Sequence, residues 1–287
     1  MVIVVTVLAV LAVVLAWPVP LRLARADWAR RHPAAGLVLW QAVGLAGGLA
    51  LLTAELSLAA VHRPGSWRGA VGSIATRPGG LGLAGTIGLA AFLLTGAWLI
   101  GVLVASTLRV AAARRRHRYV LDLLAVRDAE VPGDVSVLTH AGSAAYSIPG
   151  RRSRIVVSRG ACEALDEAQL RAVVEHERAH LRQHHDVVVQ PFVAWRNSFP
   201  FLSAAGLALR SVEELTEFLA DDAARARAGD RALGEALSVM ASAEHPVDAR
   251  RDRLARPGDG TTRTLMVAGL LACVIVLAPP ILLATVA

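Results

Sequence analysis

Four long apolar stretches limit what this chain can fold into. They run from Val2 to about Leu21, from about Leu37 to Val61, from Leu81 to Leu108, and from Leu265 to the C-terminus. A helix needs roughly 20 apolar residues to cross the hydrocarbon core of a bilayer, so the chain is predicted to have four transmembrane helices. The first stretch has neither a basic segment before it nor a small-residue cleavage site after it. We therefore expect a retained anchor and not a signal peptide.

Composition separates these stretches from a charged segment between the third and the fourth. The chain is 55% hydrophobic with a mean hydropathy of +0.50, which is too apolar for an ordinary soluble domain. Its formal charge of +7 comes from arginines beside the apolar stretches. The positive-inside rule explains arginines there, so we expect no direct nucleic-acid binding. The two cysteines, Cys162 and Cys273, lie in segments of opposite character and do not support a disulfide or a cysteine metal site.

The arginines also predict an orientation in the membrane. Dense clusters follow the first and the third stretch: Arg22, Arg25, Arg30 and Arg31, then Arg109, Arg114, Arg115, Arg116 and Arg118. Alternating spans put both clusters on one side, which should be the cytoplasm. The N-terminus then lies outside, and the large charged segment lies inside. The predicted organisation is a three-helix transmembrane region at 1–112, a cytoplasmic domain at 113–262 and a fourth transmembrane helix at 263–287.

The pattern of residues changes within the charged segment. Short β-prone runs at 135–139, 144–148 and 154–158 are separated by Gly and Pro-Gly turns and predict a small meander. Asp166 and Gln169 have capping-box spacing and begin a long helix. Residues 187–209 are apolar but interrupted, and we expect a helix pair that lies against the domain or dips into the membrane surface. A second capping box, Ser211 with Glu214, predicts the start of another helix.

The most specific motif lies in the long helix, in the sequence VVEHERAHLRQHHD at 173–186. His176 and His180 are four residues apart and share one helix face, so both imidazoles can bind a single ion. Glu177 lies about 100° further round the axis, where its carboxylate can reach a water molecule activated by that ion. This is the H-E-x-x-H arrangement of zinc peptidases, with Glu177 as general base and acid. Ordinary solvated histidines are the alternative interpretation.

A catalytic zinc site needs three protein ligands and an open position. The sequence EFLAD, 37 residues after His180, offers Glu217 as the third ligand. Four residues later, Asp221 can accept a hydrogen bond from a ligand imidazole. Rivals remain open at this point: Glu213 or Glu214 for the ligand, and Asp222 for the hydrogen bond. The predicted site is one Zn²⁺ ion on His176, His180 and Glu217, supported by Asp221.

Other polar residues near the motif have weaker signals. We interpret His184 as an exposed helix-end residue, with oxyanion stabilisation as the alternative, and His185 and Asp186 as polar groups at the helix end. We interpret Arg225 and Arg227 as part of a solvated helix face. The alternative is that one of them donates a hydrogen bond to the tetrahedral intermediate. The run at 144–148 is either purely structural or an edge that binds an extended substrate.

The pairing of HERAH with EFLAD, after AAYSIPGRRSRIVVSRGACEALDEAQLRAVV and between apolar spans, resembles the BlaR/MecR family of membrane metallopeptidases, gluzincins related to HtpX-type proteases. The resemblance covers nearly the whole chain. It implies a mainly α membrane protein, with four transmembrane helices and a cytoplasmic α+β zincin domain inserted between spans three and four. It also implies zinc ligands at His176, His180 and Glu217, and catalysis by Glu177. The sequence departs from that family in having no penicillin-binding sensor domain after span four, so β-lactam sensing is not expected.

The predicted function is that of a membrane-anchored zinc endopeptidase, a regulatory protease that cuts itself or a cytoplasmic repressor of the BlaI/MecI type. An HtpX-like protease that degrades damaged membrane proteins is an alternative with the same chemistry. An intramembrane protease is disfavoured, because each Arg or Asp around the motif would cost about 2.5–3.5 kcal/mol at the bilayer centre. A non-catalytic signalling scaffold is a further alternative, against which the intact Glu177 argues. The expected partners are a protein or peptide substrate and the lipid bilayer.

Overall fold

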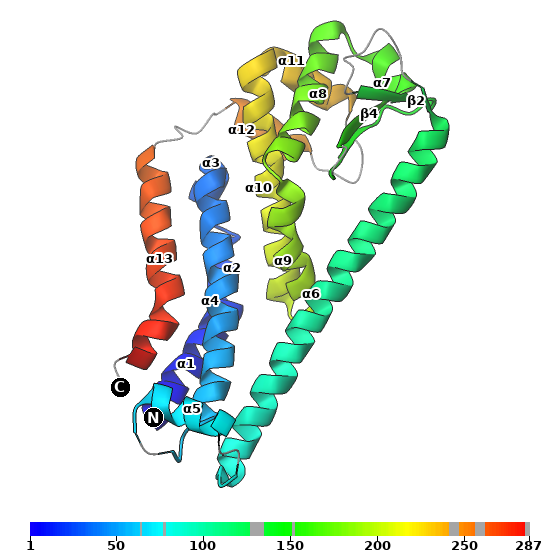
Figure 1. The fold of residues 1–287 in the computed structure, drawn as a ribbon. Helices are drawn as coiled ribbons and strands as arrows, with labels where there is room; N and C mark the ends of the chain where they lie inside the picture. Colours follow the sequence, from blue (N-terminus) through cyan, green and yellow to red (C-terminus); the bar gives the residue numbers. More distant parts are fainter. Residues whose placement is uncertain are drawn as a thin grey trace.

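The computed structural model describes residues 1–63, 65–76, 79–126, 135–150, 153–240, 247–255 and 262–284. This part of the chain is mostly helical. Long helices form an elongated bundle, and a small domain with one sheet lies at one end of it (Figure 1). The two ends of the described chain lie towards the opposite end of the bundle (Figure 1).

Four helical segments of the described chain are long and apolar enough to cross a membrane. They are α1 (Val2–Ala16) continued by α2 (Pro18–Leu23), α4 (Pro33–Ala59), α6 (Gly82–Leu124) and α13 (Thr262–Ala284). The short helices α3 (Asp27–Arg31) and α5 (Trp67–Thr76) lie in the connections between the first three. Each predicted apolar stretch therefore overlaps one of these helical segments over most of its length.

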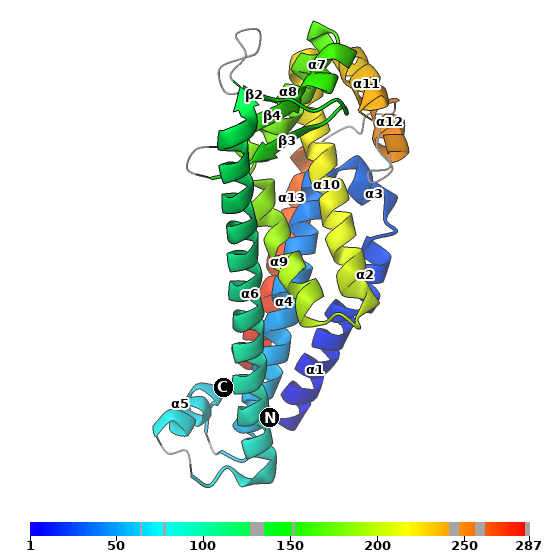
Figure 2. The ribbon, with the colours of Figure 1, turned by 90° about the vertical axis from the view of Figure 1, so that its right-hand side faces the viewer.

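Helix α6 extends well beyond the predicted end of the third stretch at Leu108. It is 43 residues long, because residues 109–121 contain neither Gly nor Pro and are rich in Arg and Ala, which are good helix formers. At 1.5 Å per residue it measures about 65 Å, roughly twice the thickness of a bilayer core. Its second half runs from the bundle to the sheet of the small domain (Figure 2). The predicted domain boundary at 112/113 lies inside this helix.

Helix α4 is the centre of the bundle and contacts α1, α6 and α13. Its Glu55 accepts a hydrogen bond of 2.9 Å from Thr95 Oγ1 of α6. Next to this pair the two helices approach closely at Gly88 of α6. A Cβ atom there would lie 2.5 Å from the backbone nitrogen of Ala59 and 2.8 Å from the carbonyl oxygen of Glu55. Only glycine fits this crossing without a shift of backbone.

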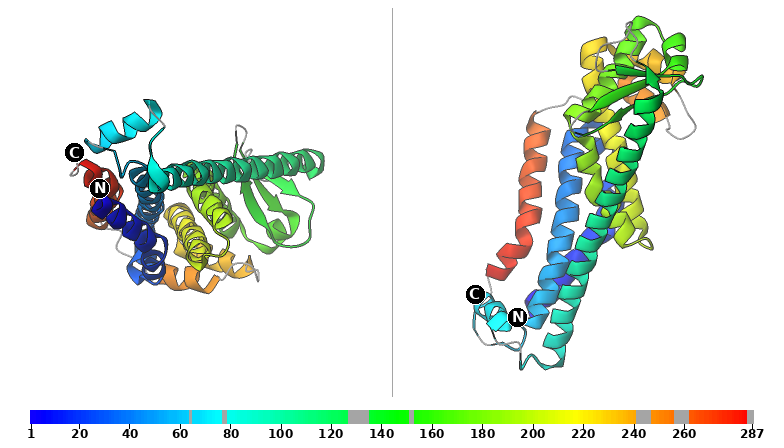
Figure 3. Two further views of the ribbon diagram at one scale, coloured as in Figure 1. Left: turned by 90° about the horizontal axis from the view of Figure 1, so that it is seen from below. Right: turned by 45° about the vertical axis from the view of Figure 1, so that its right-hand side comes forward.

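The small domain contains a four-stranded sheet whose pairing differs from the predicted meander. The strands are β1 (Ala125–Val126), β2 (Val135–Leu138), β3 (Ala145–Ile148) and β4 (Arg154–Ser158), in the order β1-β2-β4-β3. β2 and β4 are parallel neighbours, and β3 pairs antiparallel with β4 at the edge. The prediction was wrong because a run of buried residues, Ile155, Val156 and Val157, makes β4 a central strand. The sheet lies next to the helices of the small domain (Figure 3), and its edge strand β3 contacts α8.

The helices of this domain are α7 (Arg159–Ala164), α8 (Glu167–Arg182), α9 (His185–Ser198), α10 (Ser203–Ala228), α11 (Asp230–Val239) and α12 (Val247–Ala255). The predicted capping box at the start of α8 is confirmed. Asp166 accepts a hydrogen bond of 2.8 Å from the Gln169 backbone, and the Gln169 side chain accepts one of 3.2 Å from the Asp166 backbone. The segment at 187–209 forms the predicted helix pair, in α9 and the first part of α10.

The second predicted capping box is wrong, because Ser211 lies inside α10. The helix begins eight residues earlier, at Ser203, and no proline interrupts it up to Ala228. Glu214 forms an ion pair of 3.2 Å with Arg30 of α3 and does not cap a helix end. Packing of the earlier turns against α4 and α9 favours continuation of the helix over a new start.

The crossing at Gly88 can be tested with Gly88→Ala. A methyl group there must separate α4 from α6, and overpacking of this kind costs about 1–3 kcal/mol. Gly96→Ala, on the same helix but with no atom within 4 Å of the new Cβ, is the matched control. It should be neutral or slightly stabilising, because alanine favours helix over glycine by about 1 kcal/mol. Thermal unfolding in detergent, followed by circular dichroism, measures both. Equal melting temperatures would contradict the close approach.

Candidate metal centre

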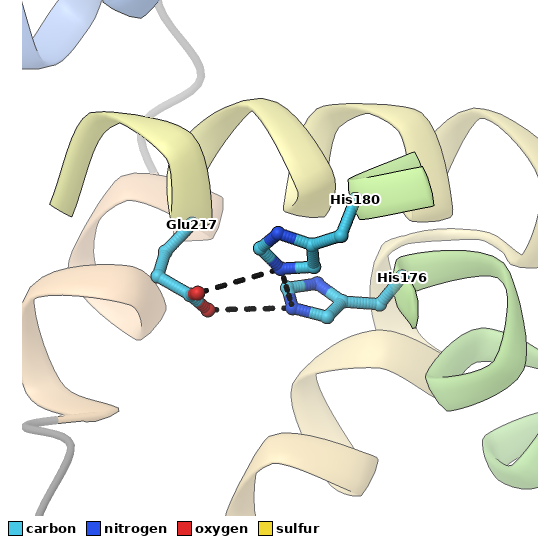
Figure 4. Close-up of side chains that lie close together, drawn as sticks. All are labelled: His176, His180 and Glu217. Atoms are coloured by element: carbon cyan, nitrogen blue, oxygen red, sulfur yellow. Dashed lines mark hydrogen bonds and ion pairs between the residues drawn. The ribbon is translucent and has the colours of Figure 1, made fainter. Parts of the chain in front are cut away.

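The candidate site lies between α8 and α10, which pack closely because their facing side chains are small. Ala172 and Ala179 of α8, and Ala220 and Ala224 of α10, are all fully buried. Small side chains let two helix axes approach, so that longer side chains at the edge of the contact can meet. His176 and His180 project from α8 at this edge, and Glu217 projects from α10 (Figure 4).

Three donor atoms converge in an arrangement that fits one metal ion. The Nε2 atoms of His176 and His180 are 3.1 Å apart. The carboxylate oxygens of Glu217 lie 3.3 Å from His176 Nε2 and 3.4 Å from His180 Nε2. Tetrahedral zinc with bonds of about 2.0–2.1 Å separates its ligand atoms by about 3.3 Å. The three residues present therefore have the right chemistry and spacing to hold zinc, with the fourth position left for a water molecule or substrate.

Asp221 contacts the first histidine from the other side of the ring. Its Oδ1 lies 3.0 Å from His176 Nδ1, and the aspartate is only 1% exposed. A carboxylate at Nδ1 keeps the proton on that nitrogen and leaves Nε2 free for a metal. The rival Asp222 points elsewhere and pairs with Arg253 at 2.7 Å. Of the two aspartates, Asp221 is the one that reaches His176.

His180 is oriented by His185, which the sequence alone predicts only as a polar group at the helix end. His185 Nδ1 lies 2.9 Å from His180 Nδ1, and His185 Nε2 lies 3.0 Å from Gln183 Oε1. Because the amide oxygen only accepts, neutral His185 carries its proton on Nε2 and accepts at Nδ1. His180 then donates from Nδ1, which leaves its Nε2 free to face Glu217. The left-handed backbone of His184, with φ of 49°, makes the turn that brings His185 back under His180.

Arg250 is the second site residue that sequence reasoning missed. It comes from α12 and donates to Asp221 Oδ2 at 2.8 Å, and it forms an ion pair of 3.2 Å with Glu217. Its guanidinium also lies 3.3 Å from His176 Nδ1. Nothing in the local sequence DARRDRLA distinguishes Arg250 from its neighbours, because the fold alone brings α12 to the site. The guanidinium compensates the charge of the buried Asp221.

The ionisation of the cluster follows from these contacts. Burial disfavours a charged His176, but hydrogen bonds to Asp221 and Glu217 outweigh it and raise the pKa of His176 to about 9. Burial, and then the charge of His176, lower the pKa of His180 to about 4. Burial works against ionised Glu217, but the hydrogen bond and charge of His176 lower its pKa to about 2. The metal-free cluster thus holds a proton on His176 between two carboxylates, and metal binding must displace it.

Glu177 lies beside the cluster in an open cavity of about 1460 Å³, which His176, His180, Glu217 and strand β3 also line. Burial raises the pKa of Glu177, and a hydrogen bond with the Ser147 side chain of β3 opposes that rise. A raised pKa suits a group that has to accept a proton near neutral pH. Ser147 is a third contact that the sequence did not reveal, because it depends on β3 being the edge strand next to α8.

The structure places the remaining sequence candidates away from the three donors. Glu213 lines the same cavity but is not part of the donor cluster found among the described residues. His184 is exposed, and Asp186 pairs with Arg114 of α6 at 2.8 Å. Arg225 and Arg227 pair with Asp230 at 2.9 Å and with Glu175 at 3.3 Å, and neither lines the cavity. Neither arginine therefore occupies the predicted oxyanion position.

Two histidines on α8 and a glutamate on α10, with the carboxylate of Glu177 beside them, form a candidate site for one divalent ion, as in metal-dependent hydrolases. Residues 111–245, just under half of the chain, match the family model described as peptidase family M48. Peptidases of this family are zinc-dependent, so the match supports a zinc metallopeptidase family for this chain. With the apolar helices, it indicates a membrane-associated metalloprotease. Searches of curated proteins and of solved structures returned no match.

The contact between His185 and His180 predicts a loss of zinc affinity in His185→Ala. Without an acceptor for its Nδ1 proton, His180 loses its fixed orientation, and zinc should bind about 10- to 100-fold more weakly. His184→Asn is the matched control, because asparagine tolerates the left-handed backbone and His184 is exposed. Competition with a coloured chelator measures both affinities. Equal affinities for the two variants would rule out the orienting contact.

The choice between the two aspartates predicts different outcomes for Asp221→Asn and Asp222→Asn. Asp221→Asn removes the charge that faces His176, so zinc affinity should fall by about 10- to 100-fold. Asp222→Asn leaves the site intact and should keep the affinity of the unmodified chain. The same chelator titration tests this pair, and circular dichroism checks that both variants are folded. A larger loss in the Asp222 variant would reverse the assignment.

Proposed function

We propose that this protein is a membrane-anchored zinc endopeptidase that hydrolyses peptide bonds of a protein substrate at the cytoplasmic face. His176, His180 and Glu217 hold one zinc ion, and Asp221 orients His176. The observation that carries the proposal is the set of three donor atoms, 3.1 to 3.4 Å apart, at a cavity that also exposes Glu177. The match to a zinc-dependent peptidase family supports it.

The chain's own residues supply proton transfer and alignment. Bound zinc supplies Lewis acidity, which lowers the pKa of water and polarises the scissile carbonyl. Glu177 takes the proton of the attacking water and passes it to the leaving amine as the C–N bond breaks. The raised pKa of Glu177 favours this uptake, and the Ser147 hydrogen bond fixes its carboxylate. Strand β3, at the sheet edge and along the cavity, binds the substrate backbone as an added strand.

The arginines support a location of this site at the cytoplasmic end of the membrane helices. Arg30 and Arg31 precede α4, and Arg114 lies on the part of α6 that leads into the small domain (Figure 2). The positive-inside rule assigns this end to the cytoplasm and the N-terminus to the outside. In this arrangement residues 1–112 and 263–287 form the membrane region, and residues 113–262 form the cytoplasmic protease domain.

The resemblance to the BlaR/MecR family favours a regulatory role, in which the protease cuts itself or a BlaI/MecI-type repressor. An HtpX-like role in removing damaged membrane proteins is the alternative, and it shares every residue of the site. A winged-helix repressor encoded next to this chain, and cut by it, would select the regulatory role. Cleavage of damaged membrane proteins without cleavage of that repressor would select quality control.

Glu177→Gln separates an enzyme from a non-catalytic scaffold. Glutamine cannot accept the proton, so cleavage should fall by about 10²- to 10⁴-fold while zinc binding is kept. Cleavage of fluorescein-labelled casein and of the chain itself is measured in detergent, alongside zinc content. Glu167→Gln, an exposed position at the start of the same helix, is the control and should leave cleavage unchanged. Unaltered cleavage in the Glu177 variant would refute the proposed mechanism.

A further inference from the structure

Helices α9 and α10 form an antiparallel hairpin that lies beside the membrane helices and not beside the sheet. We define the hairpin as residues 187–209. In Figure 2 it extends down from the small domain along α6 and α4 and turns back at the loop between Ser198 and Ser203. The hairpin also packs against α4, where the ring of Phe192 of α9 contacts the ring of Trp40 edge to face.

Contacts along α6 show how deep the hairpin reaches. Asp186 pairs with Arg114 at 2.8 Å, at the level of the arginine cluster. Further down, Gln190 donates to Ser106 Oγ at 3.1 Å. At the bottom of α9, Trp98 Nε1 donates to the Ser198 carbonyl at 3.3 Å. From Asp186 to Ser198 the helix rises by about 18 Å, beside the apolar part of α6.

The contacts of α10, the second arm of the hairpin, indicate the same depth in the membrane. Glu214 of α10 pairs with Arg30 at 3.2 Å, immediately before α4 begins at Pro33. From Glu214 down to the first residue of α10, Ser203, the helix covers about 16 Å. Both arms therefore reach about halfway through a hydrocarbon core of about 30 Å.

The hairpin has the low charge that is expected of a segment among acyl chains. Between Asp186 and Arg210 the only charged residue is Arg196. At the tip, Phe201 leaves 83% of its surface exposed and stacks against Phe199. An exposed phenylalanine at the foot of an apolar hairpin is costly in water and favourable among acyl chains.

Part of the backbone at the tip is hydrogen-bonded within the protein, which irregular chain inside a bilayer requires. The carbonyls of Trp195, Phe199 and Leu202 accept hydrogen bonds of 3.0–3.1 Å from backbone N–H groups three or four residues later. Trp98 donates to the carbonyl of Ser198, and Arg196 donates to that of Pro200 at 3.3 Å. Pro200 has no N–H to satisfy. The lone arginine is thus used as a partner for the turn.

We propose that the α9–α10 hairpin is a re-entrant element, which enters the bilayer from the protease end, turns at about mid-depth, and contacts acyl chains at Phe201. The inference rests on the membrane placement in the proposed function. It also narrows the substrate class. Glu217 is one turn above Glu214, so the metal donors lie within about 5 Å of the level where α10 enters the membrane. The peptide bond that is cut then belongs to a segment at the bilayer surface.

Thiol labelling tests the proposal. Phe201→Cys and, as the control, Glu167→Cys are made in a Cys162→Ser, Cys273→Ala background and reconstituted into vesicles of phosphatidylcholine and phosphatidylglycerol. The vesicles are made leaky so that a membrane-impermeant sulfonated maleimide reaches both faces. We expect labelling at 167 and at least tenfold slower labelling at 201. A lipophilic maleimide should label 201, and unfolding in detergent should restore its labelling by the impermeant reagent.

Two outcomes would overturn the re-entrant hairpin. Fast labelling of position 201 by the impermeant reagent would place the tip in water, and failure of both reagents would place it against protein. Asn197→Cys, at an exposed neighbouring position, gives the same readout if the Phe201 variant does not fold. The labelling is repeated in Glu177→Gln, where no cleavage is expected. The labelling experiment can therefore contradict the membrane position of the hairpin without testing the proposed enzymatic activity, and the cleavage assay can contradict the activity without testing the hairpin.

Discussion

The close packing of α8 against α10 is the constraint on which the site depends. Two histidines on one helix are set by local geometry, but the third donor must come from a second helix to within about 3.3 Å of both. Fully buried alanines on the two helices, Ala172 and Ala179 of α8 and Ala220 and Ala224 of α10, allow that approach. Larger residues there would move the axes apart, and Glu217 would lose contact with both imidazoles.

Charge balance is the second requirement of this site. Glu177, Glu217 and Asp221 are three carboxylates in one partly buried region, and such a group is unstable unless it is compensated. Arg250 compensates Asp221 and Glu217 from α12, while the proton on His176 compensates the rest when no metal is bound. A zinc ion replaces that proton with a larger charge. Arg250 lies on α12, beyond the residues 111–245 that match the peptidase family model.

The residues that sequence could predict are those fixed by local spacing. The pair His176 and His180 follows from helix periodicity, and Glu217 with Asp221 follows from the same four-residue interval on a second helix. His185, Ser147 and Arg250 escaped prediction because each reaches the site through the fold: a left-handed turn, an edge strand and a distant helix. The sheet order was mispredicted for a related reason. Turn signals between neighbouring runs favour sequential pairing, whereas the parallel pairing of β2 with β4 depends on burial.

The two arms of the hairpin connect the metal donors to the membrane in different ways: α9 is interrupted before it reaches the histidines, and α10 is continuous up to Glu217. In α9, Pro191 lacks the N–H that would continue the helix ladder, and the turn at His184 separates α9 from α8. We expect a displacement of the tip to be taken up at these two points before it reaches His176 and His180, which lie on α8 in contact with strand β3. α10 has no proline between Ser203 and Ala228, so its lower end and Glu217 move as one rod. If lipid surrounds the tip, the bilayer acts on Glu217 through α10, while the sheet holds the histidines in place.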